Sequence, residues 1–479
     1  MKIAFITLPL VALVCLSTLA QPIKLHKDNP HYFDYKGKPT VLITSGEHYG
    51  AVVNMDFDYV KYLQTLKKEG FNHTRLFLGD YVENVGAFCI VRNTLAPAPG
   101  RFIAPWMRSN TPGFAYGGNK FDLDKWNPEY FKRLKGFFEE AQKNDIVVEA
   151  VLFFVGPGWE AMPMNPKNNI NKTTDIKNTQ YMTLNNGNIL KYQEAYCRKI
   201  VNELNGFDNV IFNVANEPWF INQEIEGFSS PPANETKEWI ERVSEWIKNE
   251  ESKLGKTHIL SVDYANEGKP IKEEYLKTYF KNISVFNHHY DKNAESLALN
   301  YHLPVAITFN ETGLMHAISP QYRMQGWKYM LSGGALYNNL DFTFQVGTED
   351  GTGSTEYSCD WYNGSTFPQV RMSIKAIKNF MESIDFINMR PLSAKDMVEC
   401  HGDERFTIFG KENFYVIYLQ GSYRTRAYLK LKDGNYKFTY INPIDGNVIM
   451  KNNHIVKEGK MNFLTPEYQE DILIKIEKM

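Results

Sequence analysis

The chain has few cysteines for its length, five among 479 residues. Cys89, Cys197, Cys359 and Cys400 are widely spaced and form no CxxC pair, so the sequence contains no metal-ligand pattern and no dense disulfide framework. A chain of this length buries a large core without such links. Buried free thiols and a single disulfide therefore both remain open.

The sequence also lacks an excess of either charge. It has 53 basic and 55 acidic residues, which gives a formal net charge of -2. Nucleic-acid-binding domains usually carry a basic excess, so nothing here indicates a nucleic-acid partner. Hydrophobic residues make up 43% of the chain and charged residues 23%, which is the balance of an ordinary globular protein.

Long apolar runs are confined to the N-terminus. Lys2 precedes an almost wholly apolar stretch, 3–16, which is followed by small residues. That stretch is short for a membrane span, and the pattern predicts a secretory signal peptide at 1–20. An uncleaved anchor is the alternative; Cys15 also suggests a lipoprotein, although Val14 is a poor residue before a lipidated cysteine. We therefore expect a secreted or periplasmic protein with no stable membrane insertion.

Strand-like and helix-like segments alternate from residue 40 onward. Such alternation implies parallel strands joined by right-handed crossovers, and eight of them over about 350 residues fit a (β/α)8 TIM barrel. No GxGxxG or phosphate loop follows a strand, which weakens the alternative of a doubly wound open sheet. The predicted strands are 40–44, 71–78, 146–154, 209–214, 258–262, 283–289, 304–309 and 335–344, and the predicted helices are 56–69, 128–144, 189–204, 237–254, 271–280, 321–331 and 369–384.

The pattern of predicted secondary structure changes after about residue 387. From there, short alternating strands are separated by Asp-Gly turns, and no convincing helix remains. This pattern is typical of a small antiparallel β-sandwich. We therefore expect a signal peptide at 1–20, a barrel at 21–386 and a β-sandwich domain at 387–479. Long insertions at 80–126 and 344–367 follow barrel strands, so both should lie at the C-terminal face, where barrel active sites are built.

Two glutamates follow predicted strands directly. Glu217 comes after the fourth strand in Asn216-Glu217-Pro218, and Glu311 after the seventh in Asn310-Glu311-Thr312-Gly313. A single glutamate at a strand end usually caps a helix or pairs with arginine. Here the same arrangement recurs three strands later, and barrel strand ends meet at one face. Two carboxyl groups flanking one bond are what glycoside hydrolysis requires.

Four motifs lie on or just after predicted strands, in order along the chain: Gly70-Phe71-Asn72-His73-Thr74-Arg75, Asn216-Glu217-Pro218, His288-His289-Tyr290 and Asn310-Glu311-Thr312-Gly313. Together they resemble the motifs of clan A glycoside hydrolases near the cellulase-like family 5. The resemblance spans roughly residues 30–385. The C-terminal segment that follows is similar to a β-sandwich found behind such barrels, of a type that has been labelled collagen-binding.

The resemblance implies a retaining mechanism that needs no cofactor. Glu217 would be the acid/base and Glu311 the nucleophile. Arg75 would lie near Glu311 and keep it ionised, and Tyr290 would donate a hydrogen bond to Glu311. Asn216 would contact the 2-hydroxyl of the sugar under attack.

The two adjacent histidines should point to opposite faces of their strand, which argues against a metal site built from both. His288 shares strand parity with Tyr290, so we expect His288 rather than His289 to face the site. We expect no metal.

Other candidates for contact with substrate are less tightly specified. Trp159 and Trp219 follow predicted strands and are candidate sugar platforms, as are Trp106 and Trp361 in the two long insertions. Glu47, His48 and Tyr49 follow the first strand and are expected to line the cleft.

The end of the eighth strand, 337–342, has no tryptophan, whereas many family 5 enzymes have one there. The sugar therefore stays open, as do exo or endo action and the oligomeric state. Asn310-Glu311-Thr312 is also a glycosylation sequon; since a glycan there would block the site, we expect a bacterial host. Our hypothesis is a retaining glycoside hydrolase acting on a β-linked oligo- or polysaccharide. The alternatives are a non-catalytic carbohydrate-binding or adhesion protein, an inverting hydrolase and a transglycosylase.

Overall fold

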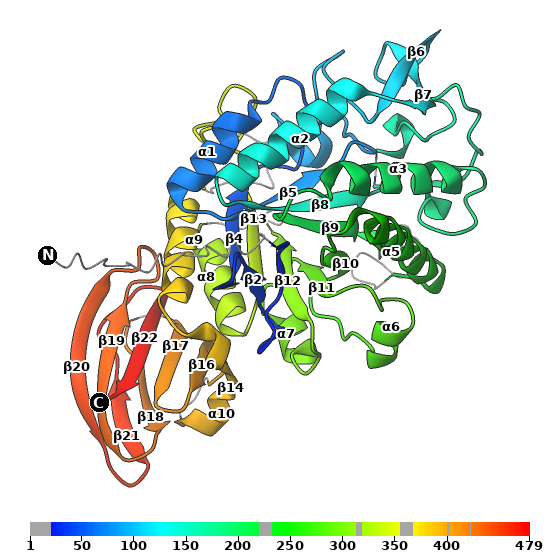
Figure 1. The fold of residues 1–479 in the computed structure, drawn as a ribbon. Coiled ribbons are helices and arrows are strands. Elements are labelled where there is room, and N and C mark those ends of the chain that lie inside the picture. The colour runs from blue at the N-terminus through cyan, green and yellow to red at the C-terminus, as the bar shows by residue number, and fades with distance from the viewer. Residues whose placement is uncertain are drawn as a thin grey trace, which may run out of the picture.

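The computed structural model of the chain describes residues 21–156, 158–219, 232–312, 319–354, 367–399, 403–421 and 423–479. The predicted signal peptide at 1–20 lies outside them. None of the helices described has the length and apolar character needed to cross a membrane. The chain forms a barrel with a β-sandwich packed against one side (Figure 1).

Eight parallel strands and an outer ring of helices form the barrel, as predicted (Figure 1). The sheet order is β4-β13-β12-β11-β10-β9-β8-β5. From β5 onward, barrel strands that follow one another along the chain are therefore neighbours in the sheet, and the first strand, β4, lies beside the last, β13. The strands are β4 (Leu42–Gly46), β5 (His73–Phe77), β8 (Val147–Phe153), β9 (Val210–Ala215), β10 (Leu260–Asn266), β11 (Val285–His289), β12 (Ala306–Glu311) and β13 (Leu336–Leu340). The helices are α1 (Tyr59–Glu69), α2 (Pro128–Lys143), α3 (Ile189–Leu204), α5 (Asn234–Leu254), α6 (Glu273–Lys277), α7 (Glu295–Asn300), α8 (Ser319–Leu331) and α9 (Phe367–Glu382).

The seam between β4 and β5 is closed by a side chain. The amide of Asn72 accepts from the backbone N–H of Ile43 and donates to the backbone oxygen of Val41, both at 2.9 Å. The Asn72 side chain thus provides hydrogen bonds between the β4 and β5 segments of the kind that backbone groups provide between other barrel strands.

Local signals explain where the helices begin and end. Asp58 caps α1 by accepting from the backbone N–H groups of Val60 and Lys61, and Gly70 ends it in the left-handed conformation, φ 90°. In α2, Asn127 is the N-cap and Pro128 occupies the first turn. The six-residue α7 was not predicted.

Within the described residues of the barrel region, five short strands lie outside the barrel sheet, three before its first strand and two in the first long insertion. An N-terminal hairpin is formed by β2 (Phe33–Tyr35) and β3 (Lys38–Thr40), and β1 (Lys24–Leu25) pairs with β2. The first long insertion contains a hairpin that was not predicted, β6 (Trp106–Pro112) and β7 (Asn119–Trp126).

The C-terminal region is the antiparallel β-sandwich predicted from the sequence. A six-stranded sheet has the order β14-β16-β17-β22-β19-β20, and a three-stranded sheet has the order β15-β18-β21. The sequence predicted no helix here, whereas α10 (Ala394–Met397) forms one turn. The strands are β14 (Arg390–Leu392), β15 (Val398–Glu399), β16 (Phe406–Lys411), β17 (Phe414–Gln420), β18 (Arg426–Lys430), β19 (Gly434–Ile441), β20 (Val448–Val456), β21 (Lys460–Leu464) and β22 (Asp471–Lys478).

The middle strands of the six-stranded sheet are buried on both faces. Along β17, Ile417 and Leu419 enter the core between the two sheets, whereas Val416 and Tyr418 join the core of the barrel. Alternation along a strand thus divides one sheet between two cores. The sandwich is therefore attached to the barrel through an apolar surface.

A buried ion pair reinforces this junction. Arg323 on α8 pairs with Asp471 on β22 through Nε (3.0 Å) and Nη2 (2.9 Å), and Tyr418 donates to the same carboxylate at 2.8 Å. The indole of Trp327 donates to the backbone oxygen of Pro443.

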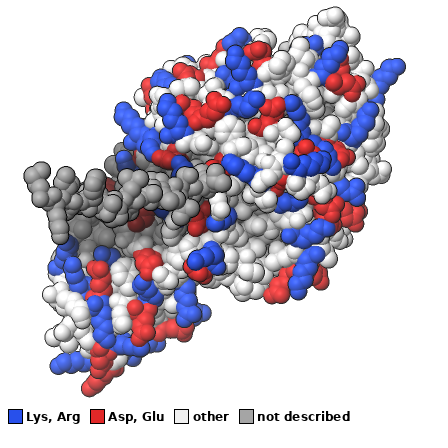
Figure 2. Space-filling model, viewed as in Figure 1, with Lys and Arg blue, Asp and Glu red and all other residues white. Residues whose placement is uncertain are grey.

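On the outer surface, by contrast, acidic and basic side chains are interspersed over the face seen in Figure 2.

We predict that Arg323→Met lowers the free energy of unfolding by about 3 kcal/mol, because it leaves the buried Asp471 carboxylate without its cation. Urea unfolding followed by tryptophan fluorescence measures the loss. The control is Arg424→Met, which removes the exposed pair with Glu467; an exposed pair contributes less than about 1 kcal/mol. Equal losses in the two variants would contradict a specific role for the junction pair.

Candidate active site

Glu217 and Glu311 meet at the C-terminal face of the barrel. Glu217 lies two residues beyond β9, and Glu311 is the last residue of β12. Both side chains are largely buried, with 12% and 7% exposed. One oxygen of each carboxylate and a ring nitrogen of His289 all lie within 4.8 Å of one another. The sequence prediction that these two acids share one place therefore holds in the structure.

Arg75 lies beneath the pair, as expected. From β5 its guanidinium donates to Glu311 Oε2 at 3.0 Å and to Asn216 Oδ1 at 2.7 Å. It also donates to Asp263 Oδ2 at 2.5 Å, and its side chain is fully buried. Arg75 thus orients both the nucleophile candidate and the amide beside the acid/base candidate.

Asp263 on β10 was not predicted, yet it contacts most of the site. Besides Arg75, its Oδ2 lies 3.1 Å from Nε2 of His289 and 3.3 Å from the backbone nitrogen of Glu217. Burial opposes ionisation, but the positive charges of Arg75 and His289 hold the pKa of Asp263 well below its ordinary range. Asp263 is therefore a permanent anion under the two glutamates.

Below the site, the barrel interior is a polar network rather than the branched apolar packing usual in such barrels. The side-chain amides of Asn213, Asn287 and Asn310 each donate to both Glu149 and Asp263, at distances of 2.7 to 3.2 Å. These five residues come from β8, β9, β10, β11 and β12. The network fixes the height of five strands relative to one another.

Two phenols complete the surroundings of Glu311. Tyr290 donates to Oε1 at 2.6 Å, as predicted, and Tyr49 donates to Oε2 at 3.0 Å. Tyr49, Glu217 and Tyr290 all have positive φ, at 60°, 41° and 54°. Left-handed backbone is rare for such residues and accumulates at functional sites, where neighbouring contacts hold it. Three side chains are thus turned into the site just beyond strand ends.

The surroundings separate the pKa values of the two glutamates. Burial raises the pKa of Glu217, the hydrogen bond from His289 lowers it, and the charge of Glu311 raises it further, so that the net change is upward. Burial also acts to raise the pKa of Glu311, but the charges of His289 and Arg75 and the hydrogen bond from Tyr290 bring it below its ordinary value. Glu311 is therefore the anion of the pair and Glu217 the proton carrier.

The histidine expectation was wrong, because His289 faces the site rather than His288. Nδ1 of His289 lies 2.8 Å from Glu217 Oε1. Nδ1 of His288 instead lies 2.9 Å from the backbone oxygen of Glu267. Parity failed because the register of β11 against β12 shifts after His288 and Tyr290 lies beyond the strand in the left-handed conformation. Asn287, a polar residue that does face inward, would have given the correct parity.

Glu47 does not line the site as expected. Its carboxylate accepts from the backbone N–H groups of Gly50 and Ala51 and from Thr94 Oγ1, and burial raises its pKa to about 7. Glu47 therefore holds the loop that carries Tyr49.

His48 pairs with a carboxylate of the first long insertion. Its Nε2 lies 3.1 Å from Glu83 Oε2. Burial would lower the pKa of His48, but the charges of Glu83, Glu311 and Glu47 raise it. A contact between His48 and substrate stays a prediction.

The tryptophans are less open than platforms require. Trp219 is fully buried, with its ring edge-on to His289 at 5.4 Å between centroids. Trp159 packs against Tyr181, and Trp106 is buried between Trp126 and Tyr196. Trp361 lies outside the described residues, as does Gly313.

Of the cysteines, Cys89 is in a disulfide and Cys197 is a buried free thiol. Both possibilities left open by the sequence therefore occur. Cys359 and Cys400 lie outside the described residues.

The cluster of Glu217, His289 and Glu311 also has the ligand types of a metal site. Burial would lower the pKa of His289, but the negative charges of Glu311 and Asp263 raise it to about 10. A protonated imidazole cannot ligate a metal, and the Arg75 cation is adjacent. The arrangement therefore favours proton transfer over metal binding.

No protein-family model and no curated protein matches the chain. Solved structures, by contrast, do match the chain. A protein of Bacteroides vulgatus ATCC 8482, provisionally assigned as a glycoside hydrolase, matches with TM-score 0.67 and 13% identity over 96% of this chain and 83% of that one. A family 5 glycoside hydrolase from the same strain has TM-score 0.62 and 12% identity, over 95% and 93%. A third, named a glycoside hydrolase, has TM-score 0.62 and 11% identity, over 96% and 97%. At such identities the similarity establishes a shared fold.

We predict that His289→Gln flattens the pH dependence of stability above neutral pH. The pKa of His289 is raised to about 10 in the folded protein and is about 6.5 in an unfolded chain. Its stabilisation is therefore complete below the unfolded value and is lost as pH rises through the folded value. Between pH 7 and 10 the wild type should lose up to about 1.4 kcal/mol per pH unit more than the variant. Urea unfolding at each pH measures this difference; parallel slopes would contradict it.

Proposed function

We propose that the chain is a retaining glycoside hydrolase, with Glu217 as acid/base and Glu311 as nucleophile. The observation that carries the proposal is the proximity of the two carboxylates, whose nearest oxygens lie within 4.8 Å. Carboxyl groups of retaining enzymes are about 5–5.5 Å apart, whereas inverting enzymes need about 6.5–9.5 Å to admit a water molecule. This spacing supports double displacement rather than inversion.

The first step needs a protonated Glu217 and an ionised Glu311, which is the distribution that the surroundings favour. Glu217 would protonate the departing glycosidic oxygen while Glu311 attacks the anomeric carbon. Arg75 and the two phenols, Tyr49 and Tyr290, already fix both oxygens of Glu311. Such fixed geometry lowers the cost of reaching the transition state.

The second step follows from the same charges. Once Glu311 is esterified to the sugar, its negative charge is gone and no longer raises the pKa of Glu217. The hydrogen bond from His289 then favours the ionised form of Glu217, which activates water against the glycosyl ester. Asp263 stays anionic throughout and holds His289 in place.

The proposed substrate and location rest on the structural neighbours and on the N-terminal segment. The structural neighbours named as glycoside hydrolases support a carbohydrate substrate, and we propose a β-linked oligo- or polysaccharide. With the signal-like segment at 1–20, the enzyme would act outside the cytoplasm of a bacterium. A protein that only binds carbohydrate needs no such division of pKa values between two glutamates, so the enzyme is favoured over the binding protein.

We predict that Glu311→Gln lowers kcat/KM on an activated β-aryl glycoside by at least about a thousandfold, because the amide cannot form the glycosyl ester. A panel of aryl glycosides measured with wild type first identifies the sugar. NMR of the first product should show the configuration of the substrate, and an inverted product would refute the retaining mechanism.

The matched control is Glu251→Gln. Glu251 is also buried and pairs with His258 at 2.7 Å, but it lies near the end of α5, on the opposite side of the barrel from the site. It should keep wild-type activity. If wild type and Glu311→Gln behave alike across the panel, the chain is not this enzyme.

We predict that Tyr290→Phe shifts the acidic limb of the kcat/KM profile to higher pH. The phenol donates to Glu311 and lowers its pKa, so removing it raises the pH at which the nucleophile ionises. A loss of about tenfold in kcat/KM at neutral pH is expected for one charge-assisted hydrogen bond. Tyr264→Phe is the control, since its hydroxyl donates to the backbone oxygen of Pro270. An unmoved acidic limb in Tyr290→Phe would contradict this role.

A further inference from the structure

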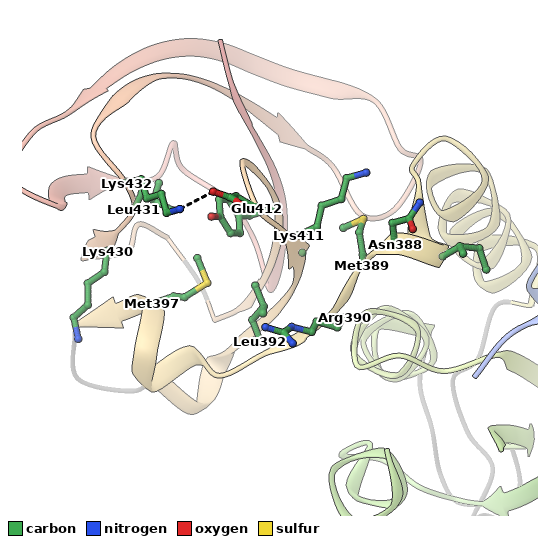
Figure 3. A pocket seen from close by; sticks show the side chains of 13 residues that line it. Asn388, Met389, Arg390, Leu392, Met397, Lys411, Glu412, Lys430, Leu431 and Lys432 are labelled. Atoms are coloured by element: carbon green, nitrogen blue, oxygen red, sulfur yellow. Dashed lines mark hydrogen bonds and ion pairs between the residues drawn. The ribbon is translucent and has the colours of Figure 1, made fainter. Parts of the chain in front are cut away.

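The β-sandwich contains a cavity of about 690 Å³ that is separate from the carboxylate site (Figure 3). It opens where β14 and α10 approach the ends of β16 and β18, between the two sheets. Its volume falls within the range of about 300–1,000 Å³ that is usual for small-ligand sites. No step of the proposed reaction uses it.

The floor of the cavity is apolar. Leu392, Met397 and Tyr415 are partly buried and pack against the core of the sandwich, and Leu431 belongs to that core. In Figure 3 the side chains of Leu392 and Met397 point toward the open space. Such a floor suits the less polar face of a sugar ring, and the Tyr415 ring offers a surface for stacking.

The rim is cationic. Arg390, Lys411, Lys430 and Lys432 line the cavity, with Glu412 as the acid among its lining residues. Two of these cations are already neutralised, since Lys432 pairs with Glu412 and Lys411 with Asp385, both at 2.5 Å.

Arg390 and Lys430 are exposed, and neither has an ion-pair partner within the described ranges of the chain. Figure 3 shows the Arg390 guanidinium beside Leu392, next to the apolar floor. A guanidinium binds carboxylate or sulfate through two parallel hydrogen bonds, which makes Arg390 the anion-binding group of the cavity.

The edge of the sheet argues against an added peptide strand. β14 is the outer strand of the six-stranded sheet, and its central residue is Pro391. Proline has no N–H for a ladder, and edge prolines prevent pairing with further strands. A ligand here is therefore not expected to bind as an additional strand on β14.

We propose that this cavity binds an anionic oligosaccharide, a sugar chain bearing carboxylate or sulfate groups. Arg390 would bind the charged group, and a ring would lie on the floor formed by Leu392, Met397 and Tyr415. Lys430, on the outer face of β18, would add longer-range attraction. The choice of a sugar over another anion rests on the proposed glycosidase function. A bound anionic glycan would keep the barrel close to carbohydrate that contains such groups.

The test is titration calorimetry on the chain lacking residues 1–20, with tetrasaccharide probes of equal length: a uronic acid tetramer, a sulfated tetramer and an uncharged tetramer. Tetraglutamate is the peptide probe. The cavity variant is Arg390→Gln/Lys430→Gln. The control variant is Lys451→Gln/Lys457→Gln, which removes the same two charges from exposed positions on and just after β20, the opposite outer strand of the same sheet.

We expect at least one charged tetramer to bind wild type, with affinity about tenfold or more weaker in the cavity variant and within about twofold of wild type in the control. Absence of binding by both charged tetramers would overturn the proposal. Equal weakening in the two variants would show diffuse attraction rather than a site. Tetraglutamate binding as tightly as the sugars, or the uncharged tetramer doing so, would overturn the ligand class. Hydrolysis of aryl glycosides is scored separately, so a failure of the proposed activity is distinguishable from a failure of this site.

Discussion

The guanidinium of Arg75 is the cation on which the other charges of the barrel depend. It is fully buried and pairs with Asp263 and Glu311, and its Nε lies 3.7 Å from Glu149. A buried charge without a partner costs several kcal/mol, so the folded protein is stable only with Arg75 and these carboxylates paired to one another. Four barrel strands, β5, β8, β10 and β12, are thereby held in one arrangement. The position of Glu311 therefore depends on these four strands together and not on β12 alone.

The same charges divide the chemistry between two residues of one type. Glu311 lies beside Arg75 and receives two phenolic hydrogen bonds, whereas Glu217 faces that anion across a short gap. Identical side chains thus acquire different protonation from their surroundings, which is the general means by which carboxylate pairs acquire separate roles. His289 lies between Glu217 and Asp263 and links the catalytic carboxylates to the buried anion beneath them.

Much of this could be predicted from the sequence, because barrel strands and helices follow simple periodicities. The eight strands followed from periodicity, and the meeting of Glu217 with Glu311 followed from their places at strand ends. The contacts of Arg75 and Tyr290 followed from the resemblance to clan A glycoside hydrolases. The orientation of His288 did not, because parity ends where the backbone of Tyr290 becomes left-handed. Asp263 was missed although a single acid within an apolar strand is a visible signal. Glu47 could not be assigned from sequence, because only the three-dimensional loop reveals its backbone partners.

The amide network inside the barrel has a consequence for how the protein unfolds. Asn213, Asn287 and Asn310 each bridge the carboxylates of Glu149 and Asp263, so no two adjacent strands satisfy their own buried polar groups. Separating β8 from β10–β12 would leave Glu149 without two of its three amide donors, which is costly for a buried carboxylate. The strands β8–β12 should therefore unfold together as one cooperative unit rather than one strand at a time.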